Sequence, residues 1–468
     1  MSFSTKLTSF FRLLKHALSG SELEFTTMPI NRAILLLAIP MILEWSMESV
    51  FALVDIYFVS QLGDSKAVAI VGYTENTLTI LYSLAMGLGM GAMAIVSRRI
   101  GEKDLAGAAT AAVQAIYLGF IIATIVCIGG IVYHKELLRL MGASPEVIEF
   151  GSNFTLWMFA GNYSITLLFL INAVFRGAGN ATIAMKVLLI ANLINIILDP
   201  IFIFGLGPIP AFGVMGAAIA TNTGRTIGVL IQFYFLFSGK TLIKVNWNNL
   251  MLRLKTITSV VKVSGGSIFQ FMIGSLSWMF LVSIMSRYGD DAVAGYHTAI
   301  RIFIFTLLPS WGLASAAAAL VGQNLGAGQP ERAETSVWRA AYYNTFYMAF
   351  VTVILLVFAP WIMSNFGNNE IATKYAIQAL RYVSVGYILY GYGMVLSQAL
   401  NGAGDTYTPT LLNIFGFWLF QIPFAYLAAV HWELEARGIF LAIVLAESLM
   451  AIAAILIFRR GKWKNVKI

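Results

Sequence analysis

The sequence predicts an all-α membrane protein with twelve transmembrane helices in two pseudo-symmetric six-helix lobes. Three observations lead to this fold class: the composition, a regular series of apolar segments, and an internal repeat. Of the 468 residues, 59% are hydrophobic and 11% are charged, and the mean hydropathy is +0.80. Soluble domains carry about 25% charged residues, so this chain is expected to cross a membrane several times.

Apolar segments long enough to cross a bilayer recur along the whole chain. A transmembrane helix needs ~20 predominantly apolar residues. A polar stretch that contains Lys244 and Arg253 separates six such segments from six more. The predicted helices cover residues 33–60, 67–97, 108–133, 148–175, 183–206, 213–238, 259–287, 292–322, 336–365, 375–400, 407–431 and 436–458.

The two halves of the chain are copies of one another. An offset of 225 residues pairs identical residues over about ninety positions, a register that composition alone does not produce. Because each half has an even number of helices, both halves enter the membrane from the same side. We therefore expect two parallel lobes with a cleft between them. The matched pairs include Gly87 with Gly312, Leu88 with Leu313, Ala92 with Ala317, Gly101 with Gly326, and 177–179 with 402–404.

Polar and basic segments set the predicted boundaries. These are an amphipathic interfacial segment (1–30), a first lobe (31–239), a cytoplasmic linker (240–258), a second lobe (259–459) and a basic cytoplasmic tail (460–468). Basic residues cluster before the first helix, after the second, in the linker and in the tail, which places both termini in the cytoplasm. The interfacial pattern consists of Phe3, Leu7, Phe10, Phe11, Leu14 and Leu18 opposite Lys6, Arg12 and Lys15.

The first predicted helix carries three acidic residues on one face. Glu44, Glu48 and Asp55 lie within roughly 40° of each other at about 100° per residue. An acidic residue at the centre of a transmembrane helix costs about 2.5–3.5 kcal/mol, and such residues normally mark an ion or substrate path. Glu44 and Glu48 either line an open, water-filled cleft or bind an ion directly. Pro40, one turn earlier, makes the helix bendable.

The fifth predicted helix carries a second polar face. Asn192, Asn195 and Asp199 follow one another at helical spacing, and Pro200 weakens the backbone hydrogen bonds beside the carboxylate. Carboxylate and amide oxygens could hold Na⁺, or a desolvated carboxylate could carry a proton. The second repeat does not copy these acids: Asp55 falls opposite Phe280 or Leu281, and Asp199 opposite Ile422. Ion coupling is therefore expected in the first lobe alone.

Other polar and aromatic residues have simpler interpretations. Glu447 and Arg301 could pair with each other or with Lys262 as structural charges, and His297 is expected to be a satisfied polar residue. Some aromatic residues either line a drug cavity or serve as packing and interface anchors. They are Trp45, Phe154, Trp157 and Tyr163.

The chain resembles the MATE (multidrug and toxic compound extrusion) family of transporters over essentially its whole length. The motifs that carry the resemblance are LVDIYFVSQLG (53–63), NAVFRGAGNA (172–181), NIILDPIFIFGLG (195–207), GVMGAAIAT (213–221) and LVGQNLGAG (320–328). The resemblance implies a V-shaped monomer in a prokaryotic plasma (inner) membrane, surrounded by lipid. It would export organic, often cationic and aromatic, compounds in exchange for Na⁺ or H⁺, without a cofactor.

Within that family the chain is most similar to the DinF-like branch. The resemblance implies that Asp55, Asn195 and Asp199 bind the coupling ion, with both aspartates as metal ligands if the ion is Na⁺. It also implies that the helix bends at Pro40. Asn172 and Thr221 match polar positions near the first-lobe cavity. Glu44, Glu48, Trp157 and Tyr163 are added as tentative residues of the substrate cavity.

Two other functions remain as alternatives. A lipid-linked precursor flippase of the same superfamily would be expected to have a strongly cationic cavity, whereas these helices show more acids than bases. A membrane-embedded enzyme is a remote alternative, because the sequence has no His-rich box, phosphate loop or nucleophile motif. The single cysteine, Cys127, excludes a disulfide framework. Nothing in the sequence indicates nucleic-acid binding.

Overall fold

The computed structural model describes residues 12–20, 24–366 and 369–468. Much of the predicted interfacial helix therefore lies outside the described residues, including Phe3, Lys6, Leu7, Phe10 and Phe11. Within the described part, residues 12–19 are helical. This helix contacts the protein, because the Thr182 hydroxyl donates a hydrogen bond to the Ala17 carbonyl at 2.7 Å. Whether the rest of the segment lies in the membrane interface stays a prediction.

The described residues are almost entirely helical. The first half contains α2 (Ile30–Ser60), α3 (Ser65–Gly101), α4 (Leu105–Leu140), α5 (Pro145–Ala160), α6 (Asn162–Gly177), α7 (Ala181–Phe204) and α8 (Val214–Phe237). The second half contains α9 (Leu254–Met285), α10 (Asp290–Gly326), α11 (Pro330–Ser364), α12 (Glu370–Val385), α13 (Tyr387–Gly402), the continuous helical stretch 407–431 and α16 (Ala436–Arg459). The linker between the halves contains a short 3-10 helix, η1 (Trp247–Leu250).

The helix count agrees with the sequence prediction. Ten helices among the described residues are long and apolar enough to cross a membrane, and the number is twelve when each bent pair counts as one span. The bent pairs are α5 with α6, at 42°, and α12 with α13, at 60°. Both correspond to single predicted segments, and each breaks at a glycine, Gly161 or Gly386. The predicted fold class is confirmed.

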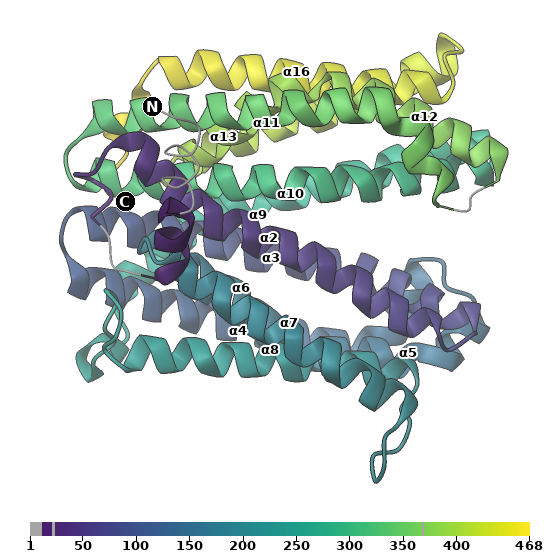
Figure 1. Ribbon diagram of the computed structural model, residues 1–468, viewed down its shortest axis with the longest axis horizontal. Coiled ribbons are helices and arrows are strands. Elements are labelled where there is room, and N and C mark those ends of the chain that lie inside the picture. The colour runs from purple at the N-terminus through teal and green to yellow at the C-terminus, as the bar shows by residue number, and fades with distance from the viewer. Residues whose placement is uncertain (1–11, 21–23, 367–368) are drawn as a thin grey trace.

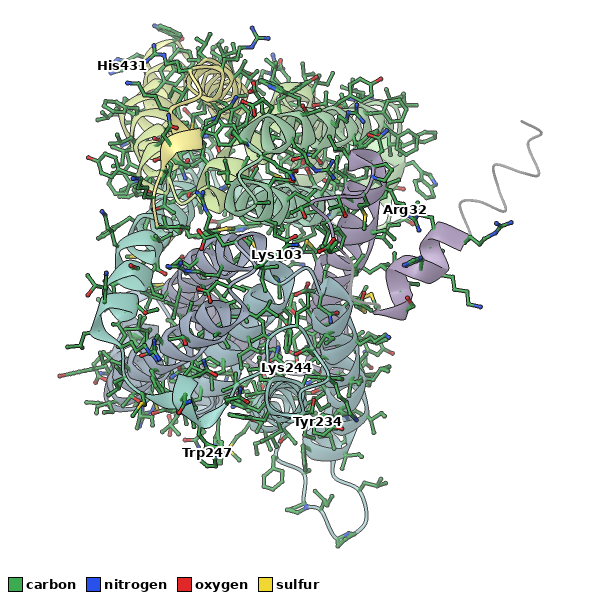
Figure 2. All side chains as sticks on the ribbon, turned by 90° about the vertical axis from the view of Figure 1, so that its left-hand side faces the viewer. Arg32, Lys103, Tyr234, Lys244, Trp247 and His431 are labelled. Carbon is green, nitrogen blue, oxygen red and sulfur yellow. The ribbon has the colours of Figure 1, made fainter. Side chains whose placement is uncertain are left out.

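Figure 1 shows that the two halves form two bundles whose helices run roughly along the long axis of the molecule. The bundles lie closest together at the end that carries both chain termini and diverge toward the other end. We call the former the terminal end. Figure 2 views the molecule from this end and shows Arg32, Lys103 and Lys244 there. This concentration of basic residues is typical of a cytoplasmic face.

The two bundles meet through contacts that repeat the internal symmetry. α3 packs against α9, and α2 packs against α10. At the first contact, a Cβ atom on Gly87 would lie 2.5 Å from the Ile268 Cα atom. At the second, a Cβ atom on Gly312 would lie 2.6 Å from the Ile42 backbone nitrogen. Because Gly87 and Gly312 are repeat partners, each glycine allows the same close approach of two backbones.

These glycine contacts lead to a prediction about stability. Gly87→Ala should lower the free energy of unfolding by about 1–3 kcal/mol, because the added methyl group overpacks against a neighbouring backbone. Gly72→Ala, on the same helix but with no atom within 4 Å of its added Cβ, is the matched control. It should be neutral or slightly stabilising. Thermal unfolding of the purified protein in detergent measures both, and equal melting temperatures would show that the helices are not this close.

Candidate functional site

Helix α2 carries its acidic residues into the interior of the first half, where Glu44 forms a buried ion pair. Glu44 Oε1 lies 2.6 Å from Arg176 Nη1, and the two side chains are only 5% and 10% exposed. Asn172 Nδ2 donates to the same oxygen at 3.0 Å, and Gln232 Nε2 donates to Asn172 Oδ1 at 2.6 Å. The network joins α2, α6 and α8, so it fixes their relative position as well as neutralising Glu44.

Glu48, one turn further along α2, pairs with the second buried arginine. Arg225 Nη2 of α8 lies 3.3 Å from Glu48 Oε1, and the Arg225 side chain is 6% exposed. The Arg225 guanidinium also stacks over the Phe51 ring, 5.1 Å from its centroid. Glu75 and Tyr82 of α3 lie close enough to interact with Arg225 as well. Arg225 is therefore the cation of a carboxylate-rich cluster.

These pairs correct one part of the expectation for Glu44 and Glu48: neither presents a free negative charge to an open cleft, whereas direct ion binding by them stays a prediction. Glu44 is buried against Arg176, and Glu48 is held by Arg225. The sequence did not predict these pairs because both arginines reach across from other helices, α6 and α8, and a single helix face does not show its partners. Breaking such a buried pair leaves an unpaired charge in the interior. Glu44 and Glu48 thus serve first to hold α2 against its neighbours.

A different group of oxygens surrounds Asp199. Asn195 Nδ2 donates to Asp199 Oδ1 at 3.1 Å and to Thr221 Oγ1 at 3.2 Å. Asp199 is 0% exposed and Asn195 is 1% exposed. Asp55 of α2 lies close enough for its charge to act on Asp199. The structure thus brings together Asp55, Asn195, Asp199 and Thr221, all of which the sequence had pointed to.

Three acceptor atoms of this group have no hydrogen-bond partner. They are Asp55 Oδ1, Asp199 Oδ2 and Asn195 Oδ1. Buried acceptors without a partner are costly, and two carboxylates facing each other repel. A proton or a small cation with oxygen ligands would relieve both penalties. Among the described residues no three His, Cys, Asp or Glu side chains gather in metal-binding geometry.

Several other predicted residues lie apart from this group. Asn172 belongs to the Glu44 network, and Asn192 donates to the Met47 carbonyl at 3.2 Å, which ties α7 to α2. The Tyr163 hydroxyl donates to Thr124 of α4 at 2.9 Å, and the Trp157 carbonyl accepts a hydrogen bond from Asn222 of α8. The structure therefore does not bring Trp157 and Tyr163 together with Glu44 and Glu48. Pro40 is buried within α2, which continues through it as one helix.

A central cavity of about 380 Å³ lies between the two halves. The rings of Trp45 and Trp311 are 5.7 Å apart at their centroids, as are those of Phe271 and Trp311. A second pocket of about 260 Å³ in the first half is lined by Glu44 and Glu48. The two share Trp45, Phe169 and Arg176. The central cavity is lined by Trp45, Met86, Gly89, Met90, Met93, Phe169, Ala173, Arg176, Phe271, Trp311, Ser315 and Gln398.

Sequence reasoning missed three residues of this region. Arg176 lies one turn after Asn172 in a quoted motif, and Glu75 is an acid in the middle of a predicted span. Either could have been found as a charge inside an apolar helix. Trp311 gave no such signal, because its role depends on the second half packing against the first.

The fold and the cavities define a class of protein: a polytopic membrane protein built from two parallel repeats with a cavity between them, which is an architecture of membrane transporters. The comparisons then give the family. Residues 40–201 and 267–427 match the MatE family, and the chain belongs to it. Its members are transporters and not enzymes.

Two curated relatives and one solved structure illustrate this membership. The probable multidrug resistance protein YoeA of Bacillus subtilis is 23% identical over 93% of this chain and 95% of its own length. An FAD transporter of Shewanella oneidensis is 24% identical over 92% of this chain and 95% of its own. The structure of a MOP superfamily transporter from Pyrococcus furiosus is 29% identical, covers 95% of this chain and 98% of its own, and superposes with a TM-score of 0.88.

The buried pair between α2 and α6 leads to a second prediction. Glu44→Gln should lower the free energy of unfolding by about 3–5 kcal/mol, because it leaves Arg176 buried without its counter-charge. Glu146→Gln, which removes the largely exposed partner of Lys66, is the control and should change it by about 0–1 kcal/mol. Denaturant unfolding in detergent micelles measures the difference. Similar values for the two variants would contradict the structural role assigned to Glu44.

Proposed function

We propose that the chain is an ion-coupled exporter of organic, cationic aromatic compounds that works by alternating access. The observation that carries the proposal is the group formed by Asp55, Asn195 and Asp199, whose buried acceptor oxygens have no partner. The relative named as a probable multidrug resistance protein supports the choice of cargo. We place the protein in a prokaryotic plasma membrane as a monomer, with its terminal end in the cytoplasm, and expect no cofactor besides the transported Na⁺ or H⁺.

The geometry suggests how an ion would act on the cargo. A cation or proton taken up between Asp55 and Asp199 removes their repulsion and draws α2 toward α7. α2 also carries Trp45, which lines the central cavity. A bend of α2 at Pro40 would therefore change the shape of the cavity wall. Binding of the ion would thus oppose binding of the drug through a movement of α2, although the two would contact different residues.

The cavity walls suit aromatic cations. Trp45, Phe271 and Trp311 line the space, and the faces of aromatic rings attract organic cations. Methionines add a deformable wall that accepts different shapes. Arg176 is the basic residue of the lining, but its charge is compensated by Glu44. The walls therefore favour flat, positively charged compounds.

Export of an anionic or lipid-linked compound is the second candidate function, and two similar proteins support it. One relative is named an FAD transporter, and the Pyrococcus furiosus structure is described as having a binding pocket of reversed polarity that suggests a different function. In this chain Arg176 would be the residue that meets an anion. Reconstituted transport of a cationic dye, of FAD and of a lipid-linked sugar, measured side by side, distinguishes these cargoes. Transport of only the last two would replace the leading proposal.

Neutralising either aspartate should stop efflux. Asp55→Asn and Asp199→Asn should each reduce dye efflux from cells to the level of vector controls. An amide has no negative charge to balance a bound cation and does not accept a proton at neutral pH. Both proteins should remain folded in the membrane, since the amide keeps the shape of the side chain. Glu149→Gln on the exposed face of α5 is the control and should retain full efflux. Normal drug resistance in either aspartate variant would defeat the assignment.

The coupling ion can be identified with purified protein in liposomes. Dye transport should be driven by an opposing gradient of either Na⁺ or H⁺, imposed one at a time, and Asp199→Asn should abolish the response to the effective ion. A protein driven by neither gradient, yet still moving dye down its own gradient, would be a uniporter and not an antiporter.

A further inference from the structure

A third cavity, which is partly open, lies within the second half of the molecule. This second-half cavity has mostly apolar and aromatic walls and a single charged side chain, which is the composition typical of small-molecule sites. Its walls come from α9, α10, α12, α13 and α16, and Phe303, Tyr387 and Ile443 among them are almost fully buried. It is lined by Trp278, Phe303, Leu307, Val383, Gly386, Tyr387, Tyr390, Ile443, Val444 and Glu447. It shares none of these residues with the central cavity.

Glu447 of α16 is the one ionisable acid in this lining, and no basic side chain accompanies it among the lining residues. The expectation that Glu447 pairs with Arg301 or Lys262 is therefore wrong. Arg301 lies on an exposed position of α10, as does His297. Tyr387 and Tyr390 lie close enough to Glu447 to interact with its charge. An acid in an apolar cavity without a counter-charge is costly unless something positive joins it.

The internal repeat shows what occupies the same place in the first half. α8 and α16 start from matching backbone conformations, with φ and ψ of 57° and −139° at Gly213 and of 52° and −137° at Glu435. The offset between these two residues places Glu447 opposite Arg225. In the first half this position holds a cation surrounded by carboxylates. In the second half it holds a carboxylate among aromatic rings, and the described residues that line the cavity include no Lys, Arg or His.

We propose that the second-half cavity binds the ammonium group of a lipophilic organic cation, with Glu447 as its counter-charge. Aromatic faces and one carboxylate are the elements that recognise quaternary ammonium groups. A bare Na⁺ would require more oxygen ligands than one carboxylate and two phenols provide. The inference deepens the proposed function, since it adds a second place for cationic compounds. It stands apart from the Asp55 and Asp199 group and is testable without transport.

A site-directed labelling experiment tests this assignment in the full-length protein. Cys127 is the single cysteine, so Cys127→Ala gives a thiol-free background. Val444→Cys then places one thiol in the cavity, one turn before Glu447. The thiol should react at least tenfold faster with a trimethylammonium methanethiosulfonate reagent than with a neutral reagent of similar size. Benzyltrimethylammonium should protect it. Adding Glu447→Gln should remove most of the rate preference and of the protection.

The controls separate this site from the others. Ser315→Cys places a thiol in the central cavity, and its labelling should not change with Glu447→Gln. Asp199→Asn should abolish efflux yet leave the labelling at Val444→Cys unchanged, so failure of one proposal does not imply failure of the other. Equal rates for the two reagents, or protection that survives Glu447→Gln, would overturn the proposal. Protection by Na⁺ at the same concentration would show an inorganic cation site instead. If Glu447→Gln does not fold, the rate preference in Val444→Cys alone decides.

Discussion

The structure of the first half depends on how the charges of α2 are compensated. Glu44 and Glu48 would each be prohibitively costly in an apolar bundle, and each is offset by an arginine from another helix. Asp55, further along the same helix, has an acceptor atom without a hydrogen-bond partner and lies close enough for its charge to act on Asp199. One helix thus carries two carboxylates that the fold pairs with arginines and a third that, in the proposed function, helps to bind the coupling ion. The two ion pairs hold α2 against α6 and α8, and the proposed ion would act on the third carboxylate.

The two halves share the arrangement of their helices but not the positions of their charged residues. Gly87 and Gly312 make equivalent close approaches, as expected of repeat partners that must let helices touch. The charged residues follow no such rule, since Asp55 has an apolar residue opposite it and Arg225 has Glu447. Packing constrains both copies in the same way, whereas an ion or ligand site is needed only where its ligand binds. Positions that are the same in both halves therefore indicate residues needed for helix packing. Charged positions that differ between the halves indicate residues that could bind an ion or a ligand.

The sequence predicted the fold because hydrophobic segment length and a repeat of fixed offset depend only on local composition. It also predicted that Asp55, Asn195 and Asp199 belong together, since each lies on a polar face of an apolar helix. It could not predict the partners of Glu44 and Glu48, because these come from α6 and α8 and depend on how helices rotate against one another. The position of Tyr163 could not be predicted for the same reason. Its ring turns toward α4, where it contacts Phe120, and not toward the tentative substrate cavity.

The placement of the strong interactions bears on how the molecule could move. Both buried ion pairs join helices of the first half, so they remain intact if the halves separate. The bundles instead meet through glycine contacts, through a buried apolar core that includes Leu37 and Leu320, and through single hydrogen bonds such as Gln323 Nε2 to the Gly177 carbonyl at 2.9 Å. Among the described residues these contacts include neither of the two buried ion pairs, and their hydrogen bonds can be exchanged for hydrogen bonds to water. The proposed transport cycle can therefore open the terminal end without breaking a buried ion pair, while each half keeps its own internal geometry.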